Sequence, residues 1–409
     1  MPRRKSPLAL QLFLAAVVCS GAVMLLVQMH ILHLHLSDFS SSMDRYMDQQ
    51  KEFFHHLPST KGKRMPRPLP SDSSDDKQPL GEIPEDEDED LKPILKILQQ
   101  AGHDITNDEE IRRESLPKWS KILDAYGPPK ILGLETCQAY RDAHLPDERT
   151  LAVGGLFNTG TNLLYALLTE NCQRNHTEIS RTKYSTVQWQ VPWGKHIPAN
   201  RRSDHTHKKP RVVYDAVMPI VTVRDPYTWM QSMCRQSYAA QFDFSKKTCP
   251  NIVPYPEDIE AHPRYGKMKH IPVHVKYDKT EGYAVKYESL PSLWNEWYSL
   301  YKNATGSFPF VMVRMEDLVF HAETVMPQLC ECAGMVYGGK LKHQGEVANQ
   351  NHGIELNATD QGLLRSIIRY GNITNRRVGY PPFQIDAAKE VLSETSLMGL
   401  FRYPYLEQE

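Results

Sequence analysis

The segment 151–172, LAVGGLFNTGTNLLYALLTENC, constrains the fold of this chain more than any other. A short apolar run predicts a strand, a glycine-rich turn follows, and an apolar helix begins near residue 161. Gly155 and Gly160 keep the glycine spacing of a nucleoside-triphosphate loop, but Thr161 and Asn162 stand where that loop requires Lys and then Ser or Thr. The segment is either a plain strand-to-helix turn or an anion site built from backbone N–H groups at a helix N-terminus.

Strand and helix patterns alternate over the C-terminal two-thirds of the chain. Strands are expected at Thr150–Gly155, Val217–Val223 and Phe308–Val313. Helical patterns lie at Thr161–Cys172, Tyr227–Gln241, Leu290–Lys302, Ala322–Ala333, Asp360–Tyr370 and Asp386–Leu400. This alternation predicts an α/β fold, with a mainly parallel sheet flanked by helices.

The N-terminal region predicts a membrane anchor. Residues Leu8–Met29 carry no charge and follow the basic sequence PRRK. As a helix, this stretch rises about 33 Å, enough to cross a hydrocarbon core of about 30 Å. A secretory signal peptide is the competing interpretation, but its apolar region normally spans only about 7–15 residues. We therefore expect a cytosolic tail at 1–7, a transmembrane signal-anchor at 8–32 and a single-pass type II topology.

The domain that follows the anchor is expected to begin near residue 126. Residues 33–125 predict a lumenal stem that is largely disordered, because Ser71–Asp90 holds ten acidic residues and one lysine and little apolar surface to bury. Asp86, Asp88 and Asp90 form D-x-D patterns there, but no apolar strand precedes them, so they are poor metal ligands. Residues 126–409 are expected to form the catalytic domain.

Net charge and cysteine content indicate which partners and which cellular compartment suit the chain. The formal net charge is -1 over 409 residues, which gives no electrostatic footprint for nucleic acid. Apart from Cys19 in the expected anchor, six cysteines suit an oxidising compartment, and their pairing is left open. Those cysteines are Cys137, Cys172, Cys234, Cys249, Cys330 and Cys332, and the N-glycosylation sequons begin at Asn175, Asn303, Asn357 and Asn372.

Two further segments carry polar residues suited to chemistry. In VMPIVTVRDPYTWMQSMC, Arg224 ends an apolar strand and Ser232 lies eight residues later on the next helix, so both can contact one phosphate. The alternative is an Arg224–Asp225 turn with a surface serine. In GKHIP, Lys195 and His196 lie in a loop. A neutral histidine there can accept a proton from a hydroxyl, and an ammonium can stabilise leaving oxygens.

Taken in order, these segments resemble the PAPS-dependent sulfotransferase family over roughly residues 150–405. The family's P-K-S-G-T-T loop is similar to FNTGTN at Phe157–Asn162, and its Arg and Ser eight residues apart match Arg224 and Ser232. GKHIP resembles the family's K-x-H-[LI]-P motif. The segment ending in VRMEDL looks like its R-Y-E-D-L segment, and NRRVGY is similar to its C-terminal basic loop.

The resemblance implies a P-loop-like sulfotransferase fold with PAPS as donor and no metal. It assigns Asn158, Thr159, Gly160, Thr161 and Asn162 to the 5′-phosphosulfate. It further assigns Arg224 and Ser232 to the 3′-phosphate, Arg376 or Arg377 to the nucleotide, His196 to the base and Lys195 to a supporting cation. The acceptor would be a hydroxyl, less often an amine, of a glycan or secreted protein in the Golgi lumen.

One departure from the family pattern is that Asn158 stands where the family has Lys or Arg. Three alternatives follow. A carboxylate could be the base instead of His196. The chain could be an inactive sulfotransferase-like protein that binds nucleotide or a partner. It could also be a type II glycosyltransferase, although no D-x-D motif follows an apolar strand in the globular part.

Overall fold

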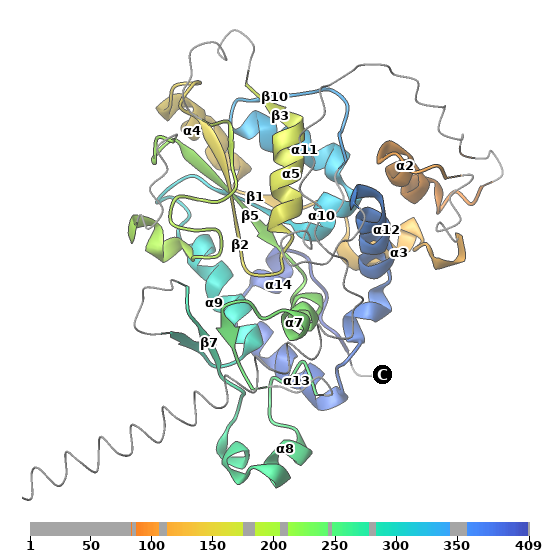
Figure 1. The fold of residues 1–409 in the computed structure, drawn as a ribbon, viewed down its shortest axis with the longest axis vertical. Helices are drawn as coiled ribbons and strands as arrows, with labels where there is room; N and C mark the ends of the chain where they lie inside the picture. Colours follow the sequence, from red (N-terminus) through yellow and green to blue (C-terminus); the bar gives the residue numbers. More distant parts are fainter. Residues whose placement is uncertain are drawn as a thin grey trace, which may run out of the picture. The chain divides into compact units, whose positions relative to one another are not determined.

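The computed structural model describes residues 83, 87–105, 113–174, 185–204, 212–243, 248–277, 284–343 and 358–407, all within the unit 77–409. Its centre is a five-stranded sheet with the strand order β1-β9-β5-β2-β4. Figure 1 labels β1, β5 and β2 of this sheet. Strands β4, β2, β5 and β9 are parallel, and β1 pairs antiparallel with β9. These strands span Ile131–Leu132 (β1), Thr150–Gly155 (β2), Val187–Gln188 (β4), Val217–Val223 (β5) and Val311–Arg314 (β9).

Helices cover both faces of the sheet. Gly154 and Gly155 are neighbours in β2, so their side-chain positions point to opposite faces. A Cβ atom on Gly154 would lie 3.5 Å from the hydroxyl of Tyr301 in α9 (Leu290–Asn303), whereas one on Gly155 would lie 2.9 Å from Thr161 in α5 (Thr161–Asn171). Helix α9 therefore covers one face and α5 the other, and every residue of β2 and β5 is buried, as expected for a parallel sheet.

The predicted α/β arrangement with a mainly parallel sheet is present. Two small antiparallel sheets accompany the main one: β10 (Val336–Tyr337) with β3 (Cys172–Gln173), and β6 (Ala240–Gln241), β7 (Val273–Val275) and β8 (Val285–Tyr287). The other helices are α2 (Lys92–Gln100), α3 (Trp119–Tyr126), α4 (Cys137–Ala143), α7 (Pro226–Arg235), α8 (Pro256–Ala261), α10 (Met315–Phe320), α11 (Ala322–Cys332), α12 (Ala358–Gly371), α13 (Pro382–Leu392) and α14 (Leu397–Leu400). Short 3₁₀ turns span Arg113–Ser115, Leu134–Thr136, Ala199–Asp204, Pro263–Lys267 and Ile373–Arg377 (η6).

The predicted transmembrane helix is the part of the fold class that has to be corrected. Within the described ranges, no helix is long and apolar enough to cross a membrane. The longest of those helices, α9 and α12, have 14 residues each and rise about 21 Å, less than a hydrocarbon core of about 30 Å. The predicted anchor at 8–32 lies outside the described residues. The prediction of a single-pass Golgi membrane location is withdrawn on the same finding.

Part of the predicted stem is folded. Helix α2 and all of α3 except its last residue, Tyr126, fall within 33–125, and both helices contact α12. Asp90 caps the start of α3, because its two carboxylate oxygens accept from the backbone N–H and the hydroxyl of Ser120, at 2.7 and 2.6 Å. Asp88 contacts Lys118 at 3.2 Å. Asp88 and Asp90 of the D-x-D pattern therefore make contacts that stabilise the start of α3. Asp86 lies outside the described residues.

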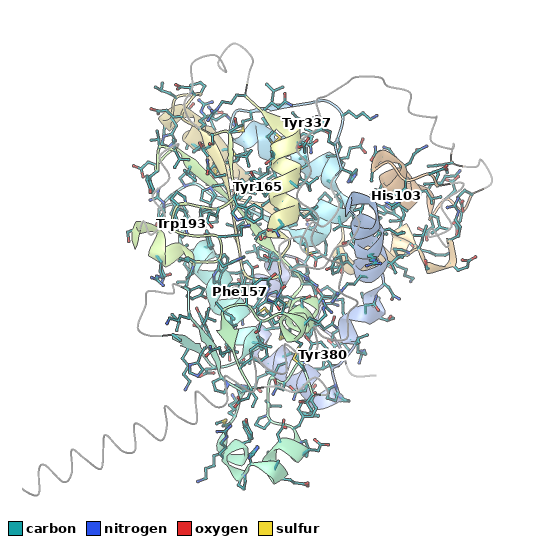
Figure 2. The ribbon with its side chains drawn as sticks, viewed as in Figure 1. His103, Phe157, Tyr165, Trp193, Tyr337 and Tyr380 are labelled. Atoms are coloured by element: carbon teal, nitrogen blue, oxygen red, sulfur yellow. A yellow bond between two sulfur atoms is a disulfide. The ribbon has the colours of Figure 1, made fainter. Side chains whose placement is uncertain are left out.

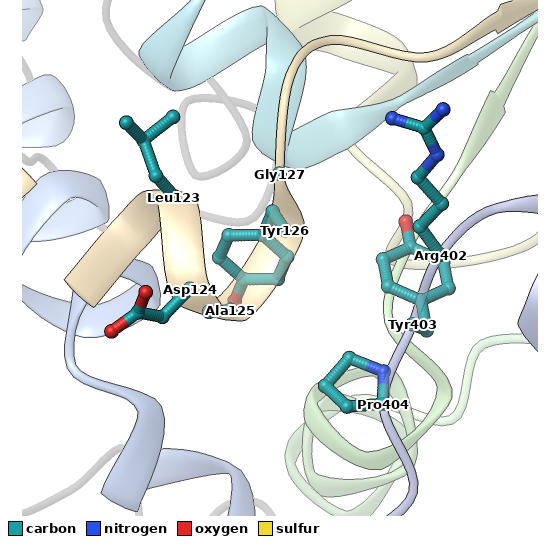
Figure 3. A pocket seen from close by; sticks show the side chains of 8 residues that line it. All are labelled: Leu123, Asp124, Ala125, Tyr126, Gly127, Arg402, Tyr403 and Pro404. Carbon is teal, nitrogen blue, oxygen red and sulfur yellow. The ribbon is translucent and has the colours of Figure 1, made fainter. Parts of the chain in front are cut away.

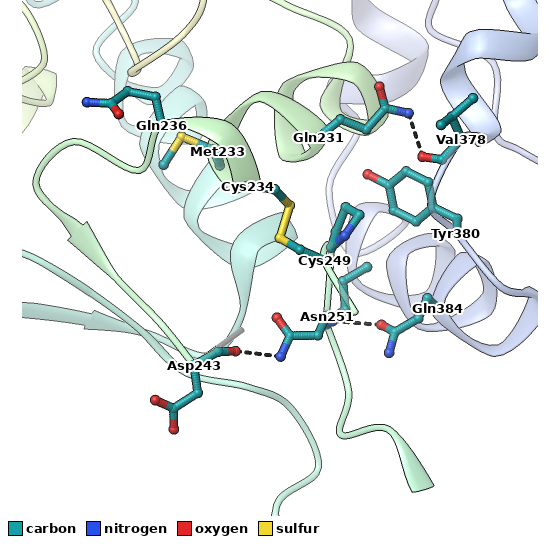
Figure 4. Close-up of a disulfide and its surroundings, with 12 residues drawn as sticks. Gln231, Met233, Cys234, Gln236, Asp243, Cys249, Asn251, Val378, Tyr380 and Gln384 are labelled. Atoms are coloured by element: carbon teal, nitrogen blue, oxygen red, sulfur yellow. Dashed lines mark hydrogen bonds between the residues drawn. A yellow bond between two sulfur atoms is a disulfide. The ribbon is translucent and has the colours of Figure 1, made fainter. Parts of the chain in front are cut away.

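Three disulfides link the six cysteines of the expected domain. Two of them join α11 to other elements: Cys137–Cys332 to α4, which precedes β2 in the chain, and Cys172–Cys330 to β3, which follows α5. The third, Cys234–Cys249, ties the last turn of α7 to the loop before α8 (Figure 4). The backbone N–H of Ile252 in that loop donates to the side chain of Gln384 in α13 at 2.6 Å. Three disulfides fit a secreted or lumenal protein.

Candidate functional site

The candidate site lies at the carboxyl end of β2. The chain leaves β2 for β4 on one side and later enters β5 on the other side. In open α/β sheets, such a topological switch point is where ligands bind. Three segments predicted from the sequence meet there: the loop 156–160 after β2, the turn at Arg224 after β5, and the segment 189–198 after β4.

The loop 156–160 has a backbone that demands glycine at its end. Gly160 has a φ of 79°, and a Cβ atom there would lie 2.7 Å from Cγ of Met315. Gly160 precedes α5 directly and has no side chain with which to cap it. The first-turn N–H groups of α5, including those of Thr161 and Asn162, therefore have no side-chain cap at the N-cap position, which leaves them suited to an anionic ligand.

Thr159 forms part of the framework of this loop. Its side chain is fully buried, donates to the carbonyl of Leu156 at 2.7 Å and lies 2.9 Å from the hydroxyl of Thr222 in β5. Phe157, two residues earlier and labelled in Figure 2, accepts through its carbonyl from the indole N–H of Trp229 at 2.7 Å. The side chain of Thr159 thus joins the loop 156–160 to β5, and its backbone is the part of the residue left to contact a ligand.

Asn158 occupies the position at which a cation was expected from the resemblance. Its φ is 59°, a left-handed conformation that asparagine tolerates better than most residues. The side-chain amide donates to the carbonyl of Gln236 at 2.7 Å, and the backbone carbonyl of Asn158 accepts from Arg224 at 2.8 Å. Asn158 therefore clamps the loop to α7.

Lys195 supplies a cation from the neighbouring segment. Its carbonyl accepts from the N–H of Gly155 at 3.0 Å, and its ammonium donates to the side chain of Asn162 at 3.1 Å. The ammonium also lies 3.0 Å from the centre of the Trp189 ring, a favourable cation–π geometry. Burial lowers the pKa of Lys195 to about 7. The predicted lysine is thus placed at the first turn of α5.

His196 is held in one orientation beside the loop. Nδ1 lies 2.7 Å from the carbonyl oxygen of Gly155. A carbonyl only accepts, so in the neutral ring Nδ1 carries the proton and Nε2 is the acceptor. Burial lowers the pKa of His196 to about 4, with Lys195 lowering it further and the carbonyls of Gly155 and Leu156 opposing the shift. The imidazole is therefore neutral at physiological pH and can accept a proton.

Arg224 and Ser232 both lie on the side of the site formed by β5 and α7. The guanidinium of Arg224 is 2% exposed and donates to Thr228 as well as to the loop carbonyl of Asn158. The hydroxyl of Ser232 accepts from the guanidinium of Arg235 at 2.7 Å. Sequence analysis missed Arg235, although its position three residues after Ser232 puts it on the same face of α7.

The side chains of Arg376 and Arg377 both form hydrogen bonds to other parts of the protein. Arg376 is 2% exposed, forms an ion pair with Asp225 through contacts of 2.9 and 2.6 Å, and donates to the carbonyl of Pro404. Arg377 donates to the carbonyl of Glu407. In this arrangement Arg376 neutralises the carboxylate of Asp225, the residue next to Arg224. Contact of Arg376 or Arg377 with a nucleotide stays a prediction.

A cavity of about 390 Å³ lies between the end of α3 and the C-terminal segment (Figure 3). Its lining residues are Leu123, Asp124, Ala125, Tyr126, Gly127, Arg402, Tyr403 and Pro404. None of the predicted site residues lines it. The carboxyl ends of β2 and β5, where the polar groups gather, are therefore the better candidate site.

Comparison with known proteins adds no family assignment. No protein-family model matches the chain, and no curated protein matches it significantly in sequence. In the part of the chain that the structure describes, no three or more histidine, cysteine, aspartate or glutamate side chains are grouped to hold a metal ion. A functional proposal therefore rests on the residues gathered at the carboxyl ends of β2 and β5.

Proposed function

We propose that the chain is a sulfotransferase that moves a sulfonyl group from PAPS to a hydroxyl, or less often an amine, of a glycan or secreted protein. One observation carries the proposal: the three segments that resemble the family's motifs meet around the N-terminus of α5. They are joined by direct contacts, from Arg224 to the loop carbonyl of Asn158, from Lys195 to Asn162 and from His196 to the carbonyl of Gly155.

The donor would lie across the loop and the start of α7. The N–H groups and positive dipole at the first turn of α5 suit the 5′-phosphosulfate, with Thr161 and Asn162 at that turn. Arg224, Ser232 and Arg235 suit the 3′-phosphate, because guanidinium groups bind phosphate bidentately. PAPS is the donor substrate here, and its phosphosulfate anhydride supplies the activated sulfonate.

The reaction would be an in-line displacement at sulfur. The acceptor oxygen forms a bond to sulfur while the bond from sulfur to the bridging oxygen breaks, and adenosine 3′,5′-bisphosphate leaves. The acceptor proton passes to Nε2 of His196, whose pKa of about 4 in the free chain would rise beside the anionic donor. The ammonium of Lys195 stabilises charge on the leaving group, a role that Asn158 cannot fill because its amide is bonded to Gln236.

The binding test uses the 3′-phosphate. Arg224→Ala is expected to weaken binding of adenosine 3′,5′-bisphosphate by about a hundredfold and that of adenosine 5′-monophosphate much less, since a charge-assisted bidentate contact is worth about 2–3 kcal/mol. Isothermal titration calorimetry measures both. Arg365→Ala, an exposed arginine of α12, is the control. Equal losses for both nucleotides would contradict the assignment of Arg224.

The pH profile tests Lys195. Its ammonium loses its proton as pH rises through about 7, so kcat/KM is expected to fall above about pH 7. In Lys195→Arg, whose guanidinium stays charged, this fall should disappear. Transfer of radiolabelled sulfonate from PAPS to desulfated glycans provides the assay. An identical alkaline limb in both proteins would mean that another group titrates.

A second candidate function is nucleotide binding without turnover, and the clamped amide of Asn158 favours it. Both candidates predict binding of adenosine 3′,5′-bisphosphate. They differ in that only the enzyme releases sulfonate from PAPS in a manner that depends on His196. The glycosyltransferase alternative loses support, because Asp88 and Asp90 of the D-x-D pattern are engaged by Lys118 and Ser120.

A further inference from the structure

A buried polar cluster lies against the turn that carries Arg224. Glu316 of α10 is its centre and is fully buried. One carboxylate oxygen of Glu316 accepts from the backbone N–H of Asp225 at 3.1 Å, and the other accepts from the hydroxyl of Tyr403 at 2.7 Å. Neither Glu316 nor Tyr403 belongs to the residues assigned above to donor or acceptor.

The cluster grips the turn that carries Arg224. The hydroxyl of Tyr403 lies 3.5 Å from the carbonyl of Val223, and the indole of Trp294 donates to the carbonyl of Arg224 at 3.0 Å. Glu316 holds the next backbone group, the N–H of Asp225. Among these three backbone contacts, the hydrogen bond from Asp225 to Glu316 is the one with an ionisable acceptor, and it is the strongest when the carboxylate is charged.

The side chain of Asp225 cannot hold this turn as well, because both of its carboxylate oxygens already have other partners. One of its oxygens accepts from the N–H of Thr228 and so caps α7, and the other pairs with Arg376. The direction in which Arg224 leaves β5 therefore depends on backbone contacts made by Glu316, Tyr403 and Trp294. A shift of this turn would move the guanidinium away from the loop carbonyl of Asn158, to which it now donates.

The buried carboxylate of Glu316 lowers the stability of the folded state when it is ionised. Burial, and next the charge of Asp225, raise the pKa of Glu316 to about 7. A carboxylate with a raised pKa destabilises the folded state once it is ionised, so stability alone does not explain its place beside a second carboxylate. The other charged and titratable groups that act on it or on which it acts are Arg314, Tyr126, Tyr298 and Tyr403.

We propose that Glu316, held by Tyr403, is a positioning residue for Arg224 that fixes the turn 223–225 so that the guanidinium meets the 3′-phosphate of the donor nucleotide. This inference rests on the proposed function. It predicts that Glu316 and Tyr403 govern the preference for a nucleotide with a 3′-phosphate, although neither contacts the nucleotide.

The test compares two nucleotides on the full chain by calorimetry. The ratio of the affinity for adenosine 3′,5′-bisphosphate to that for adenosine 5′-monophosphate is expected to fall about threefold in Tyr403→Phe, which removes one hydrogen bond to Glu316. It should fall about tenfold in Glu316→Ala, which removes the acceptor of two. Glu316→Gln, which keeps an oxygen acceptor for the N–H of Asp225, should restore most of the ratio. Tyr380→Phe is the matched control, because it removes another buried hydroxyl bond, of 2.8 Å to the carbonyl of Tyr227.

Other outcomes would overturn the inference. A general structural role would weaken binding of both nucleotides equally and leave the ratio unchanged. In an Arg224→Ala background, Tyr403→Phe should have no further effect on the ratio, and an added loss would mean that Tyr403 acts through another group. If Glu316→Ala does not fold, Tyr403→Phe alone decides. A wild-type chain that binds neither nucleotide, or both equally, would refute the proposed function itself, whereas a normal wild-type ratio that is unchanged in Tyr403→Phe would refute only the positioning role.

Discussion

Replacing His196 with alanine is expected to lower kcat for sulfonate transfer by about 10²–10⁴-fold, the usual contribution of a general base. Affinity for adenosine 3′,5′-bisphosphate should stay within about twofold of wild type, because His196 contacts the carbonyl of Gly155 and none of the groups assigned to the phosphates. Transfer of radiolabelled sulfonate to desulfated glycans, combined with calorimetry, separates the two effects.

His144→Ala is the matched control for this substitution. His144 is also half-buried against an aromatic ring, that of Tyr140, but it precedes β2 and so lies at the opposite end of that strand. Its loss should leave kcat unchanged. If His196→Ala keeps full activity while the control does too, the proton acceptor is another group, and a carboxylate becomes the first alternative.

The second large effect is expected from Asp317→Ala, which should lower the free energy of unfolding by about 3–5 kcal/mol. Asp317 and Arg314 are both fully buried and form two hydrogen bonds, of 2.6 and 2.7 Å. Asp317 also accepts from the N–H of Lys130, and Arg314 donates to the carbonyls of Tyr126 and Phe401. Removing the carboxylate would leave a buried guanidinium without its counter-ion.

Denaturant unfolding measures this loss. Lys269→Ala is the control, because the Lys269–Glu390 pair is largely exposed and such pairs contribute about 0–1 kcal/mol. If Asp317→Ala costs no more than Lys269→Ala, the buried pair does not hold the C-terminal segment and the start of β1 to the sheet edge. Binding of adenosine 3′,5′-bisphosphate below the unfolding transition should survive, since neither residue contacts the loop 156–160.

Strands and helices with strong patterns could be predicted from the sequence almost to the residue. Strands Thr150–Gly155 and Val217–Val223 have the expected bounds, and the helix expected at Leu290–Lys302 spans Leu290–Asn303. Helix α7 is shorter than expected: it ends at Arg235, before Tyr238, whose φ of 53° is incompatible with a helix. The helix expected at Asp386–Leu400 is two helices, and the first begins earlier, at Pro382, where proline suits a first turn.

The positions of Arg224 and the loop 156–160 could be predicted from the sequence, because Arg224 follows a strand and the loop leads from a strand into a helix. Parallel strands bring their carboxyl ends to one edge of the sheet, so Arg224 and the loop 156–160 had to be close. The pairing of Arg376 with Asp225 could not be predicted, since 151 residues separate them and only the folded chain brings them together. Helix α2 was not predicted, because it directly follows the acidic tract 71–90 and was assigned to the disordered stem with it. Its buried apolar residues are Ile94, Leu95, Ile97 and Leu98.

The central claim is that the first turn of α5 and Arg224 hold a 3′-phosphorylated donor nucleotide. Calorimetric titration of the wild-type chain with adenosine 3′,5′-bisphosphate, with and without EDTA and with ATP and magnesium as control, tests it most directly. We predict metal-independent binding at least about a hundredfold tighter than that of ATP, as a buried arginine on the 3′-phosphate requires. No heat of binding, or a preference for ATP with magnesium, would contradict the proposed function and leave the loop after β2 as a strand-to-helix turn.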